Sequence, residues 1–101
     1  MRYLITAIGS MSAECAIKHL KAAGHYVVGV DIYPGEWHYE TKLCDVFYQA
    51  PFATKEDKYI QFLLDTCAKH DLGYIIPLTD LEIDVINRQR EKVESKGIIL
   101  C

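Results

Sequence analysis

The chain has 101 residues, the size of one ordinary domain; half of them are hydrophobic and a quarter are charged. This balance argues against a disordered or membrane-spanning protein. The formal net charge of −3 gives no general attraction to nucleic acid or anionic lipid, so we expect neither as a partner. Four dispersed cysteines, no C-x-x-C pair and no visible secretory signal favour reduced thiols in a cytoplasmic protein without a metal site.

The first part of the chain alternates short apolar runs with a helical pattern. Residues 3–7 predict a buried central strand, because the run is apolar, rich in β-formers and too short for a helix. Residues 12–23 predict a helix whose apolar side chains recur every three or four positions and face a sheet. Gly24 ends that helix, and the β-branched run at residues 26–31 predicts a second strand.

The middle of the chain is less regular. Residues 32–45 keep no period and predict an abbreviated helix or an ordered loop. The aromatic segment from Tyr33 to Tyr39, which contains Trp37-His38-Tyr39, forms either a lid, a subunit contact or simple packing against the sheet edge. Residues 46–49 predict a third strand, which we place at an edge of the sheet because Pro51 stops it.

Two helices and two strands complete the alternation. A capping box at residues 54–57 predicts a helix that Gly73 ends, and residues 74–77 predict a fourth strand. A second capping box at residues 79–82 predicts another helix, which Gly97 ends before a fifth strand. The inward-facing residues of this last helix are predicted to be Leu81, Val85, Ile86 and Val93.

The alternation predicts an α/β domain with a Rossmann-like three-layer arrangement and a five-stranded parallel sheet of order 3-2-1-4-5. In such sheets ligands bind at the carboxyl ends of the strands, where the strand order reverses. Cys15 and Cys67 fall on or beside the apolar helix stripes, so we expect both to be small core residues.

Gly9, Ser10 and Met11 lie between the first strand and the first helix, where free amides suit a phosphate or a carboxylate. A dinucleotide fingerprint would need three glycines, but Ala7 and Ser12 occupy the two outer positions. The loop therefore either contacts an anion or substrate, or only makes a turn and caps the helix.

Asp31 is the last residue of the second strand, the position at which dinucleotide-binding folds have an acid that binds the ribose hydroxyls. It is therefore either a ribose-binding acid or a capped or solvated acid that begins a loop. Thr79, Asp80 and Glu82 follow the fourth strand. Because that strand neighbours the first, we expect these three residues to share a crevice with the Gly9 loop. The two acids there either grip an amine or cationic substrate, or belong to helix capping alone.

Four segments, taken in this order, resemble the N-terminal domain that precedes the ATP-grasp fold in carbamoyl-phosphate-synthase-like proteins and carboxylate–amine ligases. They are Tyr3–Ser10, Ala22–Asp31, Asp45–Pro51 and Tyr74–Glu82. The resemblance covers nearly the whole chain and is one of pattern and spacing. It implies a substrate-side lobe, not catalytic alone, whose glycine loop and strand-four turn form part of the wall of the acceptor-substrate site.

The resemblance also implies what lies elsewhere in such an enzyme. ATP and magnesium would bind in lobes beyond Cys101, so residues 1–101 are expected to be one pre-ATP-grasp domain of a longer enzyme, with no cofactor of their own. The substrates would be a carboxylic acid and an amine, and a homodimer stays open. The substrate-binding residues that it implies are Gly9, Ser10, Met11, Thr79, Asp80 and Glu82, with Asp31 as a further candidate.

Two other classes of protein stay open on the sequence. One is the first half of an NAD- or nucleotide-dependent oxidoreductase or epimerase, which Asp31 favours and the incomplete glycine pattern disfavours. The other is a stand-alone regulatory or interaction domain, whose reading frame would end at Cys101.

Overall fold

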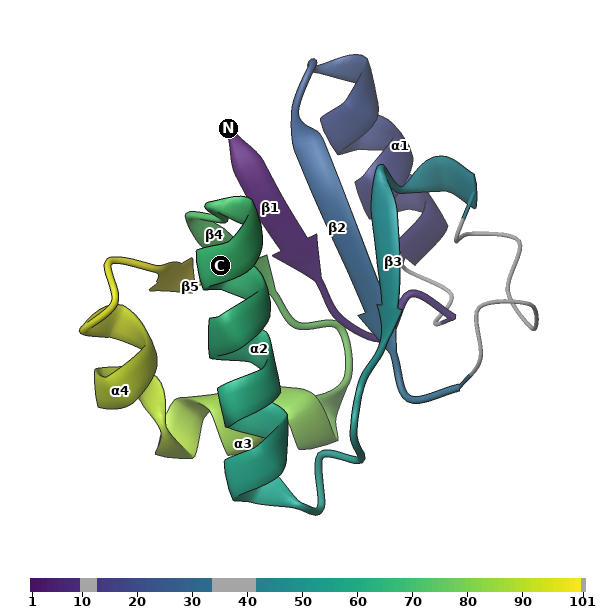
Figure 1. Cartoon of the computed structure of the whole chain (residues 1–101). Helices are drawn as coiled ribbons and strands as arrows, with labels where there is room; N and C mark the ends of the chain where they lie inside the picture. Colours follow the sequence, from purple (N-terminus) through teal and green to yellow (C-terminus); the bar gives the residue numbers. More distant parts are fainter. Residues whose placement is uncertain (10–12, 34–41, 101) are drawn as a thin grey trace.

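The computed structural model describes residues 1–9, 13–33 and 42–100 (Figure 1). Several positions singled out above lie outside the described residues: Ser10, Met11, Ser12, the Trp37-His38-Tyr39 segment and Cys101.

The strands form one parallel sheet. They are β1 (Arg2–Ile5), β2 (Tyr26–Asp31), β3 (Val46–Gln49), β4 (Tyr74–Ile76) and β5 (Ile99–Leu100). Their order is β3-β2-β1-β4-β5, and Leu4 of β1 lies opposite both Val28 of β2 and Ile75 of β4. The predicted fold class, strand order and edge position of β3 are confirmed. Because every neighbouring pair is parallel, the carboxyl ends of the strands meet at one edge of the sheet.

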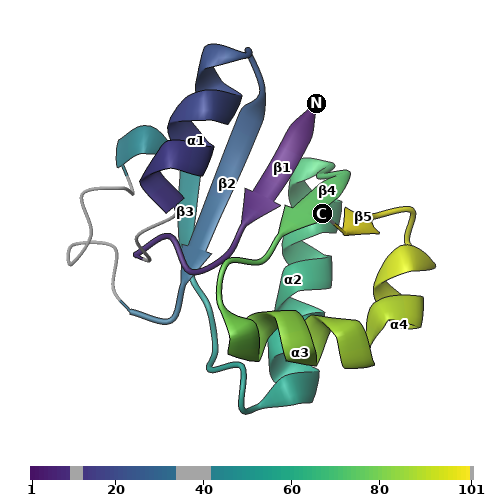
Figure 2. The ribbon, with the colours of Figure 1, turned by 180° about the vertical axis from the view of Figure 1, so that it is seen from behind.

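Helices cover both faces of this sheet. The helix α1 (Ala13–Ala22) lies on one face, whereas α2 (Glu56–His70) lies on the other, as Figures 1 and 2 show from opposite sides. The shorter helices α3 (Asp80–Arg88) and α4 (Arg90–Glu94) pack into the same core as α2. The arrangement is the predicted three-layer domain.

Alternate side chains of the central strands supply a hydrophobic core on each face, as expected for strands covered on both sides. On one face, the fully buried Ile5 packs in a cluster with Ile17 of α1. On the other face, Leu4 belongs to a larger cluster with Leu63 of α2 and Val85 of α3. Burial of these side chains is the main term that stabilises the fold.

Two glycines have structural reasons for being glycine. Gly24 has a φ of +85°, the left-handed conformation that ends α1 as predicted. Gly29 lies in the middle of β2, where a Cβ atom would come within 2.6 Å of Cys44 Sγ and 2.9 Å of Ile8 Cγ2. The close approach of these two side chains to the strand therefore requires a residue without a side chain.

The ends of α2 differ from the prediction. The helix begins at Glu56 with Lys55 as its N-cap and without a side-chain capping bond, so the capping box predicted at residues 54–57 is wrong. Its C-cap is Asp71, with a left-handed φ of 55°, which a short polar side chain tolerates. Gly73 is not the stop, because its amide already donates a hydrogen bond across the sheet to β1.

The pattern between residues 79 and 97 predicted one helix, but the structure has two. Gln89 separates α3 from α4. Its side-chain amide donates to the carboxylate of Glu56 at the start of α2, at 2.6 Å, and Arg88 Nε donates to the same carboxylate at 2.8 Å. These hydrogen bonds, with an Arg88–Glu56 ion pair, hold the break between the two helices against α2.

Two side chains predicted to be buried lie at the surface. Leu81 is 52% exposed although the i,i+4 spacing places it on the same side of α3 as the buried Val85, because it lies in the first turn of the helix, at the carboxyl edge of the sheet. Cys15 is exposed because it lies two positions from Ile17, off the buried stripe of α1. The predicted burial of Val85, Ile86, Val93 and Cys67 is confirmed. Burial raises the pKa of the Cys67 thiol to about 12.

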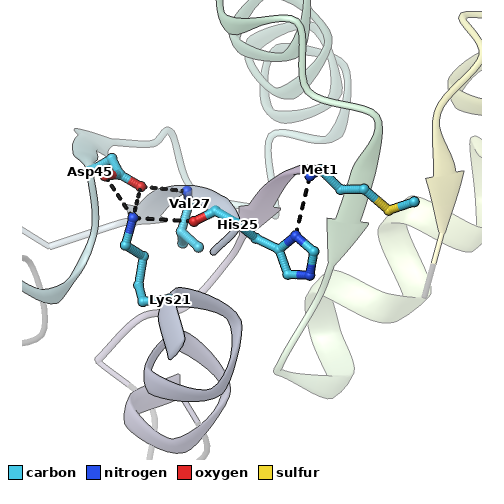
Figure 3. Close-up of polar contacts among 5 residues, drawn as sticks. All are labelled: Met1, Lys21, His25, Val27 and Asp45. Atoms are coloured by element: carbon cyan, nitrogen blue, oxygen red, sulfur yellow. Dashed lines mark hydrogen bonds and ion pairs between the residues drawn. The ribbon is translucent and has the colours of Figure 1, made fainter. Parts of the chain in front are cut away.

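A polar cluster joins elements at the start of β2 (Figure 3). Asp45 accepts two hydrogen bonds from Lys21 Nζ, at 2.7 and 2.8 Å, and one from the Val27 amide at 2.8 Å. Lys21 also donates to the His25 carbonyl at 3.2 Å, and the Met1 amino group lies 3.2 Å from His25 Nδ1. The cluster ties the end of α1 to the segment that enters β3.

Candidate functional site

A cavity of about 290 Å³ opens at the carboxyl edge of the sheet. The segments that line it follow β1, β2, β3 and β4, so it lies where the strand order reverses, as predicted for a ligand site. Its lining residues are Ala7, Gly9, Asp31, Ile32, Tyr33, Phe52, Ala53, Thr54, Thr79, Leu81 and Glu82.

The cavity brings together four of the residues predicted from the sequence: Gly9, Asp31, Thr79 and Glu82. Asp80, the fifth one described, is exposed and does not line it. The shared crevice expected between the Gly9 loop and the strand-four turn is therefore present for these side chains. Whether any of them binds a ligand stays a prediction.

Asp31 anchors the first loop of the cavity. Its side chain is only 7% exposed, and its two carboxylate oxygens accept hydrogen bonds from the backbone amides of Gly9 (2.9 Å) and Tyr33 (3.0 Å). A carboxylate held by two amides is fixed in position. Asp31 thus joins the loop after β1 to the segment after β2, a role that the sequence pattern did not identify.

The loop after β1 carries backbone strain at Ala7. This residue has a φ of 51°, in the left-handed region that side chains other than glycine rarely adopt. It occupies the position where a dinucleotide fingerprint has its first glycine, so the turn is made here without that glycine. Strained residues of this kind concentrate at functional sites.

Glu82 anchors the opposite side through a buried network. Its side chain is 9% exposed; one carboxylate oxygen accepts a hydrogen bond from Thr79 Oγ1 at 2.7 Å, and the other accepts one from the Tyr59 hydroxyl of α2. Thr6 lies in the same network, since its hydroxyl oxygen accepts from the Leu78 amide at 3.3 Å and its side chain also bonds to Tyr59. The network connects the segment just after β1 with α2 and α3 at the wall of the cavity.

The environment of Tyr59 keeps its hydroxyl protonated. Burial raises the pKa of Tyr59, and the negative charge of Glu82 raises it further. The phenol therefore stays a hydrogen-bond donor to Glu82 over the whole physiological range. No property of the sequence other than an apolar helix stripe marked Tyr59, so its place in the network could not be predicted.

The capping box predicted at residues 79–82 is corrected in part. Thr79 is the N-cap of α3, but its side chain makes no capping bond to a backbone amide. It donates to the Glu82 carboxylate instead, because Tyr59 draws that carboxylate down into the core. The two side chains thus form part of the cavity wall rather than a capping box.

The rim of the cavity is apolar. Tyr33 (45% exposed), Phe52 (53%) and Leu81 (52%) all line it, although large apolar side chains are otherwise mostly buried in the described residues. The sequence analysis assigned Tyr33 only to the aromatic segment of residues 33–39, did not select Phe52 and predicted Leu81 to be buried. The signal that could have found the first two is their position just after β2 and β3, at the carboxyl edge.

The charges of the cavity do not suit a nucleotide. Among the described residues that line it, Asp31 and Glu82 are acidic and none is a lysine or an arginine. Triphosphate binding needs cationic side chains or free amides, and the Gly9 amide already donates to Asp31. The described residues also contain no group of three His, Cys, Asp or Glu side chains that could hold a metal ion. Among the described residues, the cavity therefore offers no cationic side chain and no metal cluster to hold the ATP and magnesium that the family resemblance implies.

The fold and the site define a Rossmann-like α/β domain with an apolar-rimmed cavity at the carboxyl edge of its sheet. The sequence pattern of one family, described as PylC-like, N-terminal domain, matches residues 4–101. The chain belongs to this family. The resemblance to the domain that precedes the ATP-grasp fold is thereby confirmed, whereas no curated protein matches the sequence.

Solved structures with the same fold include two carboxylases. The biotin carboxylase domain of Hydrogenobacter thermophilus 2-oxoglutarate carboxylase, solved with MgADP, ADP and bicarbonate, superposes with a TM-score of 0.68 at 20% identity. The match covers 98% of this chain and 22% of that one. Kluyveromyces lactis urea carboxylase gives a TM-score of 0.69 at 20% identity, covering 98% of this chain and 9% of that one.

A short-chain dehydrogenase/reductase superfamily protein from Agrobacterium tumefaciens, solved with bound NAD, also shares the fold. Its TM-score is 0.56 at 10% identity, with 97% of this chain and 30% of that chain covered. At these identities the likeness shows the fold alone. This chain spans about a fifth or less of the length of the carboxylases that it matches. Among its described residues, none of the helices combines the length and apolar character needed to cross a bilayer.

Proposed function

We propose that this domain is the substrate-side N-terminal lobe of an ATP-dependent carboxylate–amine ligase, similar to the large subunit of carbamoyl-phosphate synthase, and that it is not catalytic by itself. Membership of the PylC-like N-terminal domain family supports the class of enzyme. The main support for a substrate-binding role is the cavity at the carboxyl edge, which is lined by Gly9, Asp31, Thr79 and Glu82. In this proposal, the cavity is one wall of the acceptor-substrate site.

The proposal separates substrate binding from nucleotide chemistry. ATP and magnesium would bind to other lobes of the complete protein, which activate a carboxylic acid as an acyl phosphate for attack by an amine. The residues of this domain would bind and orient the acceptor, and would exclude water from one side of it. We further propose that the protein is cytoplasmic and that it can form a homodimer.

The second candidate is the first half of an NAD- or nucleotide-dependent oxidoreductase or epimerase. It is favoured by Asp31, which closes β2 at the position of a ribose-binding acid. It is disfavoured by the hydrogen bonds that Asp31 already accepts from two backbone amides and by the non-glycine Ala7 at the turn. The family match favours the ligase over this candidate.

An assay of ADP and phosphate release by the complete protein that carries this domain tests the proposal. With ATP, magnesium and a panel of acid–amine pairs, we expect release that requires both the acid and the amine. Residues 1–101 alone should release none. Net reduction of NAD without ADP release would instead support the oxidoreductase and overturn the ligase.

A matched pair of variants connects the assay to the cavity. Glu82→Gln removes the buried charge from the cavity wall, so we expect kcat/KM for the acceptor to fall by about tenfold or more. Glu94→Gln is the control, because Glu94 lies exposed on α4 in an ion pair with Arg90 and does not line the cavity. Equal kinetics in the two variants would restrict Glu82 to a structural role.

A further inference from the structure

We infer that the carboxyl-edge cavity selects a small amine with an apolar body, and that it excludes anions such as nucleotides. The inference deepens the proposed function and rests on it for the role of the bound amine as an acceptor. It names the class of substrate, which the family match does not supply.

The first argument is the size and surface of the cavity. A volume of about 290 Å³ suits a ligand of roughly the size of one amino acid rather than a nucleotide or a peptide. Tyr33, Phe52 and Leu81 present large apolar side chains at its rim, each about half exposed. Covering these side chains with an apolar ligand removes their surface from water, which is favourable.

The second argument is that the two buried carboxylates already accept hydrogen bonds from other groups of the protein. Asp31 accepts from the Gly9 and Tyr33 amides, and Glu82 accepts from Thr79 and Tyr59. These partners fix the carboxylates in the walls. The acids therefore act on a ligand through their charge rather than as mobile groups that close around it, and most of the contact surface offered to the ligand is apolar.

The third argument is the sign of the charge. Both acids line the cavity, and none of the described lining residues is a lysine or an arginine. Two negative charges with low-polarity walls create a potential that attracts cations and repels anions. An ammonium group attached to an apolar body matches both features of the cavity, whereas a carboxylate or phosphate matches neither.

Titration of the 101-residue chain with three small probes tests the inference. The amide resonances of Gly9, Tyr33 and Ala53 report on the cavity walls. We expect 2-phenylethylamine to shift them, with saturation. Ethanolamine lacks the apolar body and 3-phenylpropionate reverses the charge, so each should bind about tenfold more weakly or not at all. Equal binding of 3-phenylpropionate, or equal binding of ethanolamine, would overturn the inference.

Two variants of matched exposure locate the site. Phe52→Ser removes a rim side chain that is 53% exposed, whereas Ile99→Ser removes one that is 54% exposed on β5, away from the cavity. We expect Phe52→Ser to weaken 2-phenylethylamine binding about tenfold and Ile99→Ser to leave it within about twofold. Equal affinities in both variants would contradict the assignment, and thermal melting confirms that each variant is folded.

A second copy of the chain could also cover the rim of the cavity, and it would give a different experimental result from a small amine. If the rim instead covers a second copy of the chain, sedimentation should show a dimer that Phe52→Ser dissociates, and this result would overturn the small-amine assignment. The outcome is separable from the proposed function. Saturable amine binding without acid-dependent ADP release in the complete protein would support the amine site and reject the ligase function. Acid-dependent ADP release without amine selectivity in the cavity would support the ligase function and reject the amine site.

Discussion

At the scale of single residues, buried or half-buried carboxylates determine which segments are held together. Asp31 and Glu82 fix the two sides of the cavity, and Asp45 fixes the opposite end of the sheet. The sequence identified Asp31 and Glu82 as candidates from their positions after strands. It could not identify their partners, because hydrogen bonds such as that between Tyr59 and Glu82 join positions 23 residues apart.

Asp45 gives a pH-dependent prediction. Burial opposes its ionisation, but hydrogen bonds from Lys21 and the Val27 amide, with the charge of Lys21, hold the pKa of Asp45 below its ordinary value of 3.8. Asp45→Asn should therefore lower the free energy of unfolding at pH 7 by about 1–2 kcal/mol. Urea denaturation measures this change.

The sign of the pH dependence follows from the lowered pKa. A carboxyl group whose pKa is lower in the folded state stabilises the protein fully above its unfolded-state pKa. The contribution is lost as the pH falls through the folded-state value. The difference between the wild type and Asp45→Asn should accordingly shrink below pH 3.8. The exposed pair of Arg90 and Glu94 supplies the control, since Glu94→Gln should cost less than about 0.5 kcal/mol at either pH.

Gly29 gives a prediction about close packing. Gly29→Ala places a methyl group 2.6 Å from Cys44 Sγ and 2.9 Å from Ile8 Cγ2, so the surrounding side chains must move. We expect a loss of about 1–3 kcal/mol in the free energy of unfolding. Gly73→Ala is the matched control, because a Cβ atom there meets nothing within 4 Å, and it should change stability by less than about 0.5 kcal/mol. Equal denaturation midpoints would refute the packing argument.

At the scale of secondary-structure elements, local patterns predicted the existence of most helices and strands better than their ends. The strands β2 and β3 have the predicted bounds, because Asp31 and Pro51 mark where regular pairing stops. The break between α3 and α4 escaped prediction, because it depends on Glu56, a residue of α2 more than 30 positions away. A one-dimensional pattern does not record such tertiary contacts.

The hydrogen bond from Tyr59 to Glu82 joins α2 to α3 and can be tested separately. Tyr59→Phe leaves a buried carboxylate oxygen without its phenol donor, so we expect a loss of about 1–3 kcal/mol. Tyr74→Phe is the control, since the Tyr74 ring stacks on Tyr3 and its hydroxyl makes none of the hydrogen bonds found among the described residues. If both variants unfold at the same urea concentration, the Tyr59–Glu82 contact contributes nothing to stability.

At the scale of the whole molecule, the fold could be predicted because alternation and right-handed crossovers leave few arrangements for five parallel strands. The position of the site followed from the fold, since the carboxyl edge at the reversal of strand order is where such sheets bind ligands. Its chemistry could not be predicted in the same way. The apolar rim formed by Tyr33, Phe52 and Leu81 exists only where the segments after β2 and β3 meet the first turn of α3.

The central claim is that this domain binds the acceptor side of a ligase reaction and leaves nucleotide binding to other lobes. Calorimetric titration of residues 1–101 with ATP and with NAD tests it most directly, because the cavity holds two acids and no described lysine or arginine. The account predicts no binding of either nucleotide tighter than about 10 µM. A dissociation constant below that value, for ATP or for NAD, would contradict it.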